Sequence, residues 1–181
     1  MLLFALLQAG AATGAAPLAP VAFNDNRVAA GRLRNGVFEL SLELRRGLWH
    51  PLGPDKEAIS IFAFGETGKG LETPGPLLRV PLGTRIRVRV HNATEQPVVL
   101  HGFSVHRTAV QDTLALGAGA SGLAEWSADA EGTYYYWGSR PGATLPERNP
   151  EDRLLTGAFI VDPAGTHAAG GTAPRDRVFV I

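Results

Sequence analysis

The stretch Thr84-Arg85-Ile86-Arg87-Val88-Arg89-Val90-His91 decides the fold class, because polar and aliphatic side chains alternate along it without a break. Successive side chains of a β-strand point to opposite faces of its sheet, so this period of two predicts one wet face and one core face. The arginines could be read as a nucleic-acid patch. A solvated sheet face explains them better, since no run of basic residues accompanies them elsewhere.

The same signals recur on both sides of this stretch. Alternating, apolar or aromatic runs are separated by turn residues, and Thr73-Pro74-Gly75-Pro76 is a turn that no helix could pass through. Helical periodicity is missing, so the chain is predicted to be all-β, an antiparallel sandwich or barrel. Strands are expected at residues 37–44, 58–64, 77–80, 84–91, 98–103, 122–127, 133–137 and 156–161.

The composition limits what the chain can do. With 181 residues, 45% of them hydrophobic, it can bury one good core. A formal net charge of zero gives no overall field that would attract nucleic acid or an anionic membrane. The absence of cysteine excludes disulfides, thiolate zinc sites and a blue-copper centre, which needs a cysteine thiolate.

The two ends of the chain differ from its middle. Residues 1–22 carry no charged side chain, begin with an apolar run and continue with small residues, which is typical of a signal or leader segment. Ala9-Gly10-Ala11 is one candidate cleavage site, although a disordered leader or a membrane anchor would also fit. We therefore expect an exported protein, periplasmic or extracellular, with no membrane span once the leader is removed.

Residues 23–163 are expected to form the domain itself, and residues 164–181 a linker followed by one more strand. Residues 164–174 are rich in Gly, Ala and Thr, whereas Arg175-Asp176-Arg177-Val178-Phe179-Val180-Ile181 reads as an apolar strand without a following partner. This strand is interpreted as the start of a further domain. A homo-oligomer is also compatible with the sequence.

Two short motifs carry little chemistry. The segment Gly117-Ala118-Gly119-Ala120-Ser121-Gly122 fits G-x-G-x-x-G, but no helix has room to follow it, so it is predicted to be a turn. Asn92-Ala93-Thr94 is a glycosylation sequon. No two of the five histidines lie two apart on a strand, so taken alone they favour surface roles over a metal site.

Four segments, in order, resemble the first domain of the multicopper oxidase family. Thr73-Pro74-Gly75-Pro76 and the strand ending at Asn92 resemble its opening, and Val98-Val99-Leu100-His101-Gly102-Phe103 is similar to its H-x-H-G-L strand. Gly132-Thr133-Tyr134-Tyr135-Tyr136-Trp137-Gly138-Ser139 stands where the family has G-T-[YF]-W-Y-H-S-H, and Gly157-Ala158-Phe159-Ile160-Val161-Asp162-Pro163 resembles its closing strand. The resemblance implies a Greek-key β-sandwich of the cupredoxin (plastocyanin-like) type.

The resemblance also implies a copper role, with the copper ligand motifs degenerate in this chain. In the family, this domain gives two H-x-H pairs to a trinuclear copper cluster shared with another cupredoxin domain. The first pair falls on Val99 and His101, the second on Trp137 and Ser139. Only His101 has a metal-ligating imidazole, so it is the one candidate metal ligand; strand packing or a hydrogen bond is the alternative explanation of this residue, and the favoured one.

Three interpretations follow. The first is the N-terminal, mainly structural domain of an exported copper-dependent oxidoreductase, with further cupredoxin domains of the same polypeptide as partners and no oxidase turnover by this segment alone. The second is a stand-alone, metal-free binding or assembly module. The third is a small-molecule pocket made by His101, Tyr136, Ser139 and Arg140.

Overall fold

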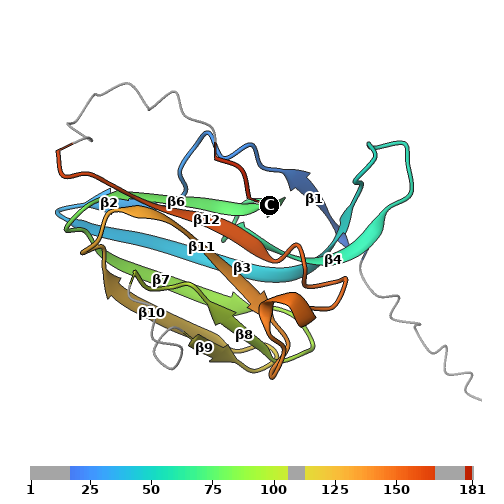
Figure 1. Ribbon diagram of the computed structural model, residues 1–181. Coiled ribbons are helices and arrows are strands. Elements are labelled where there is room, and N and C mark those ends of the chain that lie inside the picture. The colour runs from blue at the N-terminus through green and yellow to red at the C-terminus, as the bar shows by residue number, and fades with distance from the viewer. Residues whose placement is uncertain (1–16, 106–112, 166–177, 181) are drawn as a thin grey trace, which may run out of the picture.

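Two β-sheets face each other in the computed structural model, which describes residues 17–105, 113–165 and 178–180 (Figure 1). The first sheet has seven strands, with β1-β5-β4-β3-β7-β10 side by side and β2 paired to β3. They are β1 (Ala19–Phe23), β2 (Arg32–Arg34), β3 (Val37–Trp49), β4 (Ile59–Glu66), β5 (Leu71–Thr73), β7 (Arg85–Asn92) and β10 (Ser121–Ser127).

The second sheet has five strands in the order β6-β12-β11-β8-β9. They are β6 (Gly75–Pro81), β8 (Val98–His101), β9 (Thr113–Leu116), β11 (Gly132–Ser139) and β12 (Thr156–Asp162). A short 3₁₀ turn, η1 (Leu145–Glu147), lies between β11 and β12. Among the described residues, no helix is long and apolar enough to cross a membrane.

The core lies between the sheets, and the alternation read from the sequence builds it. Along β7, Ile86, Val88 and Val90 are fully buried, whereas the arginines between them are exposed. One of these, Arg87, pairs with Glu125 of the neighbouring strand. The solvated sheet face expected from the alternation is therefore confirmed. Burying an aliphatic side chain contributes about 1.5–3 kcal/mol, so this face supplies much of the stability.

The all-β class and the eight expected strands are confirmed, but the expectation of a purely antiparallel sandwich was wrong. Four strand pairs run parallel: β1 with β3, β1 with β5, β3 with β7, and β6 with β12. At several points the chain crosses from one sheet to the other instead of forming a hairpin with the strand just completed. Thr73-Pro74-Gly75 is one such switch, since β5 ends at Thr73 in one sheet and β6 begins at Gly75 in the other.

Near its two ends the chain is described from residue 17 onward and again at residues 178–180. The boundary expected at residue 22 lies inside β1, which pairs with β3 and β5, while residues 1–16 lie outside the described residues. The strand expected at residues 175–181 is described only at 178–180, which belong to neither sheet. There, Asn26 Nδ2 donates to the Val178 carbonyl at 3.2 Å, and Val178 and Val180 pack on Leu77, Ala158 and Ile160.

Candidate functional site

The register of β8 and β11 brings the four family ligand positions into one block. His101 is paired with Trp137, and Val99 with Ser139, in an antiparallel arrangement. The residues between them, Leu100 and Gly138, face the core, so by the alternation of a strand the four positions share the outer face of the five-stranded sheet. Two segments 38 residues apart in sequence thus come together on one face of the sheet.

Three flat groups are stacked at this block. The His101 and Trp137 rings lie with centroids 3.9 Å apart and planes 11° from parallel. Beside Trp137, the guanidinium carbon of Arg148 lies 5.4 Å from a ring centroid of the indole, within the range of a cation–π contact. His101 thus packs against Trp137 on the neighbouring strand. No sequence motif predicted a role for Arg148, which lies eleven residues beyond Trp137.

Ser139 is committed to the local backbone. Its residue is almost fully buried, and its hydroxyl donates to the carbonyls of Arg140 and Ala143 at 3.0 and 3.3 Å. These contacts fix the turn that leaves β11. A neutral hydroxyl is a poor copper ligand, and the proton of this one is already directed to the two carbonyls of the turn.

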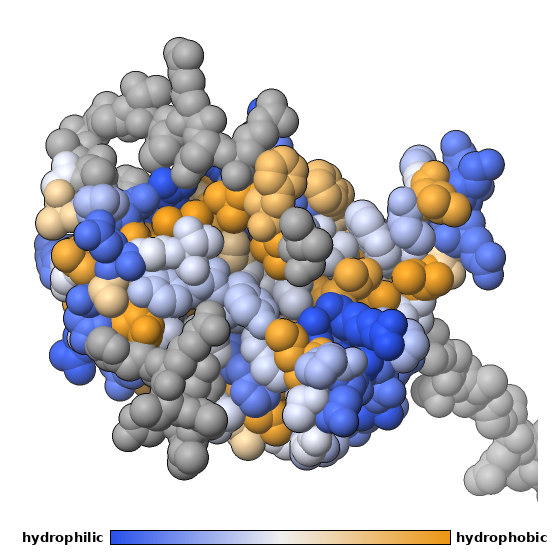
Figure 2. Space-filling view, viewed as in Figure 1, coloured by the Kyte–Doolittle hydropathy of each residue, from blue (hydrophilic) through white to orange (hydrophobic). Residues whose placement is uncertain are grey.

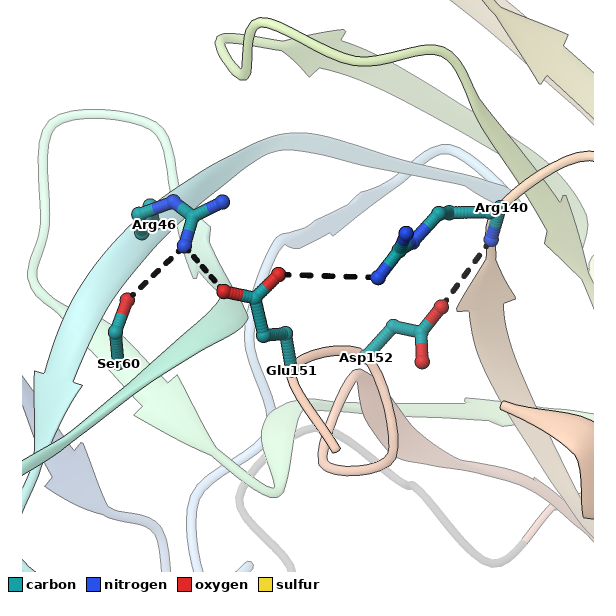
Figure 3. A network of polar contacts seen from close by, with 5 residues as sticks. All are labelled: Arg46, Ser60, Arg140, Glu151 and Asp152. Atoms are coloured by element: carbon teal, nitrogen blue, oxygen red, sulfur yellow. Dashed lines mark hydrogen bonds and ion pairs between the residues drawn. The ribbon is translucent and has the colours of Figure 1, made fainter. Parts of the chain in front are cut away.

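Arg140 belongs to a polar network that joins the two sheets at the edge of the site (Figure 3). Glu151 accepts a short hydrogen bond from Arg46 of β3 and lies 3.9 Å from Arg140, while Arg46 also donates to Ser60 Oγ at 3.3 Å. The backbone N–H of Arg140 donates to Asp152 Oδ2 at 3.2 Å. Arg140 thus serves the sheet-to-sheet contact.

The proposed pocket of His101, Tyr136, Ser139 and Arg140 is not formed. Tyr136 is fully buried in the core, where its hydroxyl donates to the Pro76 carbonyl at 2.6 Å, and burial raises its pKa well above the ordinary value. Because neighbouring residues of a strand face opposite ways, Tyr136 lies on the side of the sheet away from His101 and Trp137. The aromatic run is therefore split: Tyr134 and Tyr136 pack in the core, Tyr135 and Trp137 face outward.

The residues present do not fit a copper half-site. A copper ion in this position needs imidazole nitrogens, whereas the block offers one imidazole, an indole, an isopropyl group and a committed hydroxyl. Within residues 17–105, 113–165 and 178–180, no group of three or more His, Cys, Asp or Glu side chains could hold a metal ion. His50 and His91 lie on or next to strands of the other sheet, where they are hydrogen-bonded with the Lys56 carbonyl and the Ser121 hydroxyl. His106 and His167 lie outside the described residues.

A pocket of about 460 Å³ opens on the same outer face, next to the stack. Arg148 contributes to one wall, and residues 178–180 contribute to another. Figure 2 shows hydrophobic residues gathered near this C-terminal segment, over β6 and β12. The lining residues are Thr133, Tyr134, Tyr135, Leu145, Arg148, Thr156, Ala158, Val178, Phe179 and Val180.

Comparison with known proteins identifies the family. The fold is shared with cupredoxin-like domains of solved oxidases, and a family model described as multicopper oxidase matches residues 68–165, more than half of the chain. The chain therefore belongs to the multicopper oxidase family.

Three solved structures illustrate the shared fold. They are a multicopper oxidase from Campylobacter jejuni described as a metallo-oxidase (TM-score 0.59, 18% identity, 81% of this chain and 31% of that one), Lac15 from a marine microbial metagenome (0.57, 20%, 70% and 33%) and the blue copper oxidase from Nitrosomonas europaea (0.56, 22%, 78% and 51%).

A curated relative is similar in sequence. The chain is 30% identical over 162 residues to a probable nitrite reductase–hydroxylamine oxidoreductase fusion protein of Kuenenia stuttgartiensis. The match covers 82% of this chain but only 18% of that protein. The chain thus corresponds to one part of much longer relatives.

Proposed function

We propose that this chain is the N-terminal structural domain of a larger, exported multicopper oxidase-like protein, and that it holds no copper itself. The observation that carries the proposal is the donor set at the paired positions of β8 and β11, where three of four ligand positions have no imidazole. Relatives of which the match covers only 31%, 51% and 18% support the presence of further cupredoxin domains as partners.

The residues that occupy the copper-ligand positions of the family support a structural role for this domain. The stack of His101, Trp137 and Arg148 has the contacts of a packed surface, and imidazole-to-indole stacking contributes about 0.5–1.5 kcal/mol beyond the area it buries. An apolar and aromatic face of this kind suits contact with another domain. Copper and oxidase turnover would then belong to other parts of the polypeptide, with export directed by the uncharged segment that precedes β1.

Copper content of the full chain tests this proposal. After incubation with copper and extensive dialysis, we expect elemental analysis to find less than about 0.1 copper per chain, because one imidazole gives weak binding. The triple variant Val99→His/Trp137→His/Ser139→His is the matched gain-of-ligand control and should retain more copper. Stoichiometric copper in the unaltered chain that disappears in His101→Ala would overturn the proposal.

A second candidate function is a stand-alone, metal-free binding or assembly module, favoured by the pocket beside Arg148 and by Phe179, which is 78% exposed. The reading frame after the codon for Ile181 distinguishes the two. Continuation into domains with Cys- and His-rich copper motifs supports the first function. An immediate stop codon supports the second.

A further inference from the structure

We propose that the pocket beside Trp137 binds a small organic monocarboxylate with an apolar or aromatic body, and that Arg148 receives the carboxylate. The pocket is separate from the copper-ligand positions of the family, since Val99, His101 and Ser139 are not among its lining residues. Three features carry the inference: the charge and contacts of the Arg148 guanidinium, the residues that line the pocket, and the volume of the pocket.

The guanidinium of Arg148 is held in place but is not neutralised. Its Nε donates to the Leu145 carbonyl and its Nη1 to the Asp152 carbonyl, both at 3.2 Å, and the Trp137 ring lies against its face. In the part of the chain that the structure describes, no carboxylate forms an ion pair with it. Nη2, with two N–H donors, is used by none of these contacts.

The charged groups near Arg148 do not neutralise its guanidinium. Burial lowers the pKa of the Arg148 guanidinium from its ordinary value, Asp152 acts in the opposite direction, and Arg153 adds to the lowering. The carboxylate of Asp152 is buried and receives the Arg140 N–H, and the Glu147 carboxylate accepts from Thr144. A positive charge that is partly removed from water gains most from an incoming anion, because few solvent contacts must be given up.

The remaining walls specify the body of the ligand. Tyr135 and Phe179 give aromatic residues and Leu145 and Val178 aliphatic residues to the lining, so an apolar, flat group would replace water there. A volume of about 460 Å³ lies within the usual range of about 300–1,000 Å³ for small-molecule sites. A planar guanidinium fixed by two carbonyls and an indole is suited to bidentate recognition of a carboxylate.

The full chain is titrated with 3-phenylpropionate and, as the matched uncharged probe, with 3-phenylpropionamide. Binding is followed through the NMR signals of the Trp137 indole N–H and the Arg148 Nε–H. We expect the carboxylate to bind at least ten-fold more tightly than the amide. Inorganic phosphate should not saturate the same signals, because it lacks the apolar body. Equal affinity for the carboxylate and the amide, or equal affinity for phosphate, overturns the proposal.

Two variants separate the charge from the pocket. Arg148→Gln should weaken 3-phenylpropionate binding at least ten-fold, whereas Arg34→Gln, which removes an equal charge from exposed strand β2, should leave it unchanged. Thr156→Phe keeps Arg148 and fills the pocket from β12, so it should also weaken binding at least ten-fold. Unaltered affinity in Arg148→Gln or in Thr156→Phe overturns the proposal. If Arg148→Gln fails to fold, Thr156→Phe and the comparison of the two probes decide.

Discussion

Gly102 gives a structural reason for the His101-Gly102 pair at a site where three of the four copper-ligand positions are not histidine. Its backbone has φ of +84°, a left-handed conformation that residues with a Cβ adopt only at a cost. A Cβ added there would lie 2.1 Å from the Tyr135 carbonyl oxygen and 2.7 Å from the Tyr136 Cα. The His101-Gly102 pair is thus explained by the stack on Trp137 and by the close approach of β11, without reference to copper.

Gly102→Ala is expected to destabilise the domain by more than about 3 kcal/mol, since backbone strain and a backbone clash act together. Urea denaturation followed by tryptophan fluorescence measures the change. The matched control is Gly83→Ala, because Gly83 has nearly the same φ, +86°, but no atom within 4 Å of an added Cβ. The control should cost about 1–2 kcal/mol. Equal losses in the two variants would contradict the role of close packing.

At the scale of elements, Asn92 joins the end of β7 to two loops. Its side-chain amide donates to the carbonyls of Gln96, Leu116 and Gly117, and its oxygen accepts from the N–H and hydroxyl of Thr94. The residue is fully buried. The Asn92-Ala93-Thr94 sequon is therefore a structural feature of the folded domain, in which the amide that would carry a glycan is enclosed.

We expect Asn92→Ala to cost about 3 kcal/mol of unfolding free energy, because it leaves several buried carbonyls and an N–H without partners. Thermal unfolding followed by circular dichroism provides the measurement. His91→Ala is the neighbouring control: the ring of His91 is hydrogen-bonded with the exposed Ser121 hydroxyl, and its loss should cost below about 1 kcal/mol. A wild-type unfolding temperature in Asn92→Ala would show that the loops do not need this residue.

At the scale of the whole molecule, two mixed sheets enclose the main core, and a partly buried titratable side chain makes the stability depend on pH. Burial raises the pKa of the Glu72 carboxyl on β5, against a smaller lowering by Lys69. The native state therefore retains this proton at pH values where the unfolded chain has lost it. Stability falls as pH rises past the ordinary glutamate pKa and is fully present below it.

Glu72→Gln should accordingly unfold at a higher temperature than the unaltered chain at pH 7, and at the same temperature near pH 3, where both states carry the proton. Differential scanning calorimetry at the two pH values checks this. Glu57→Gln, an exposed change in the loop before β4, serves as the control and should show no comparable gain. An advantage of Glu72→Gln that increases on acidification would reverse the assigned sign.

Much of the fold could be predicted because strand signals are local. The eight strands expected from alternation and turn residues are present, and Gly117–Gly122 spans the turn between β9 and β10. Strands β1, β2, β5 and β9 were missed because each has only three to five residues, too few for an alternation to stand out. The parallel pairs were missed because a crossover between sheets leaves no local pattern.

The candidate site was predictable in composition but not in arrangement. The residue types at Val99, His101, Trp137 and Ser139 followed from the family resemblance, and the structure shows them together on one face. The expected pocket with Tyr136 and Arg140 was wrong, because Tyr136 faces the core and Arg140 serves the contact between sheets. Arg148 gave no signal, since its position depends on the turn after η1 and not on a strand period.

The sequence by itself determined the all-β class, the two faces of the main strands and the chemistry that the ligand positions lack, because these depend on residue type and on the two-residue period of the extended chain. Only the tertiary structure decided the mixed pairing, the stacking of His101, Trp137 and Arg148 and the pocket beside them. The physical reason is that register and long-range contacts are set by how remote segments bury their apolar faces together, which no local pattern records.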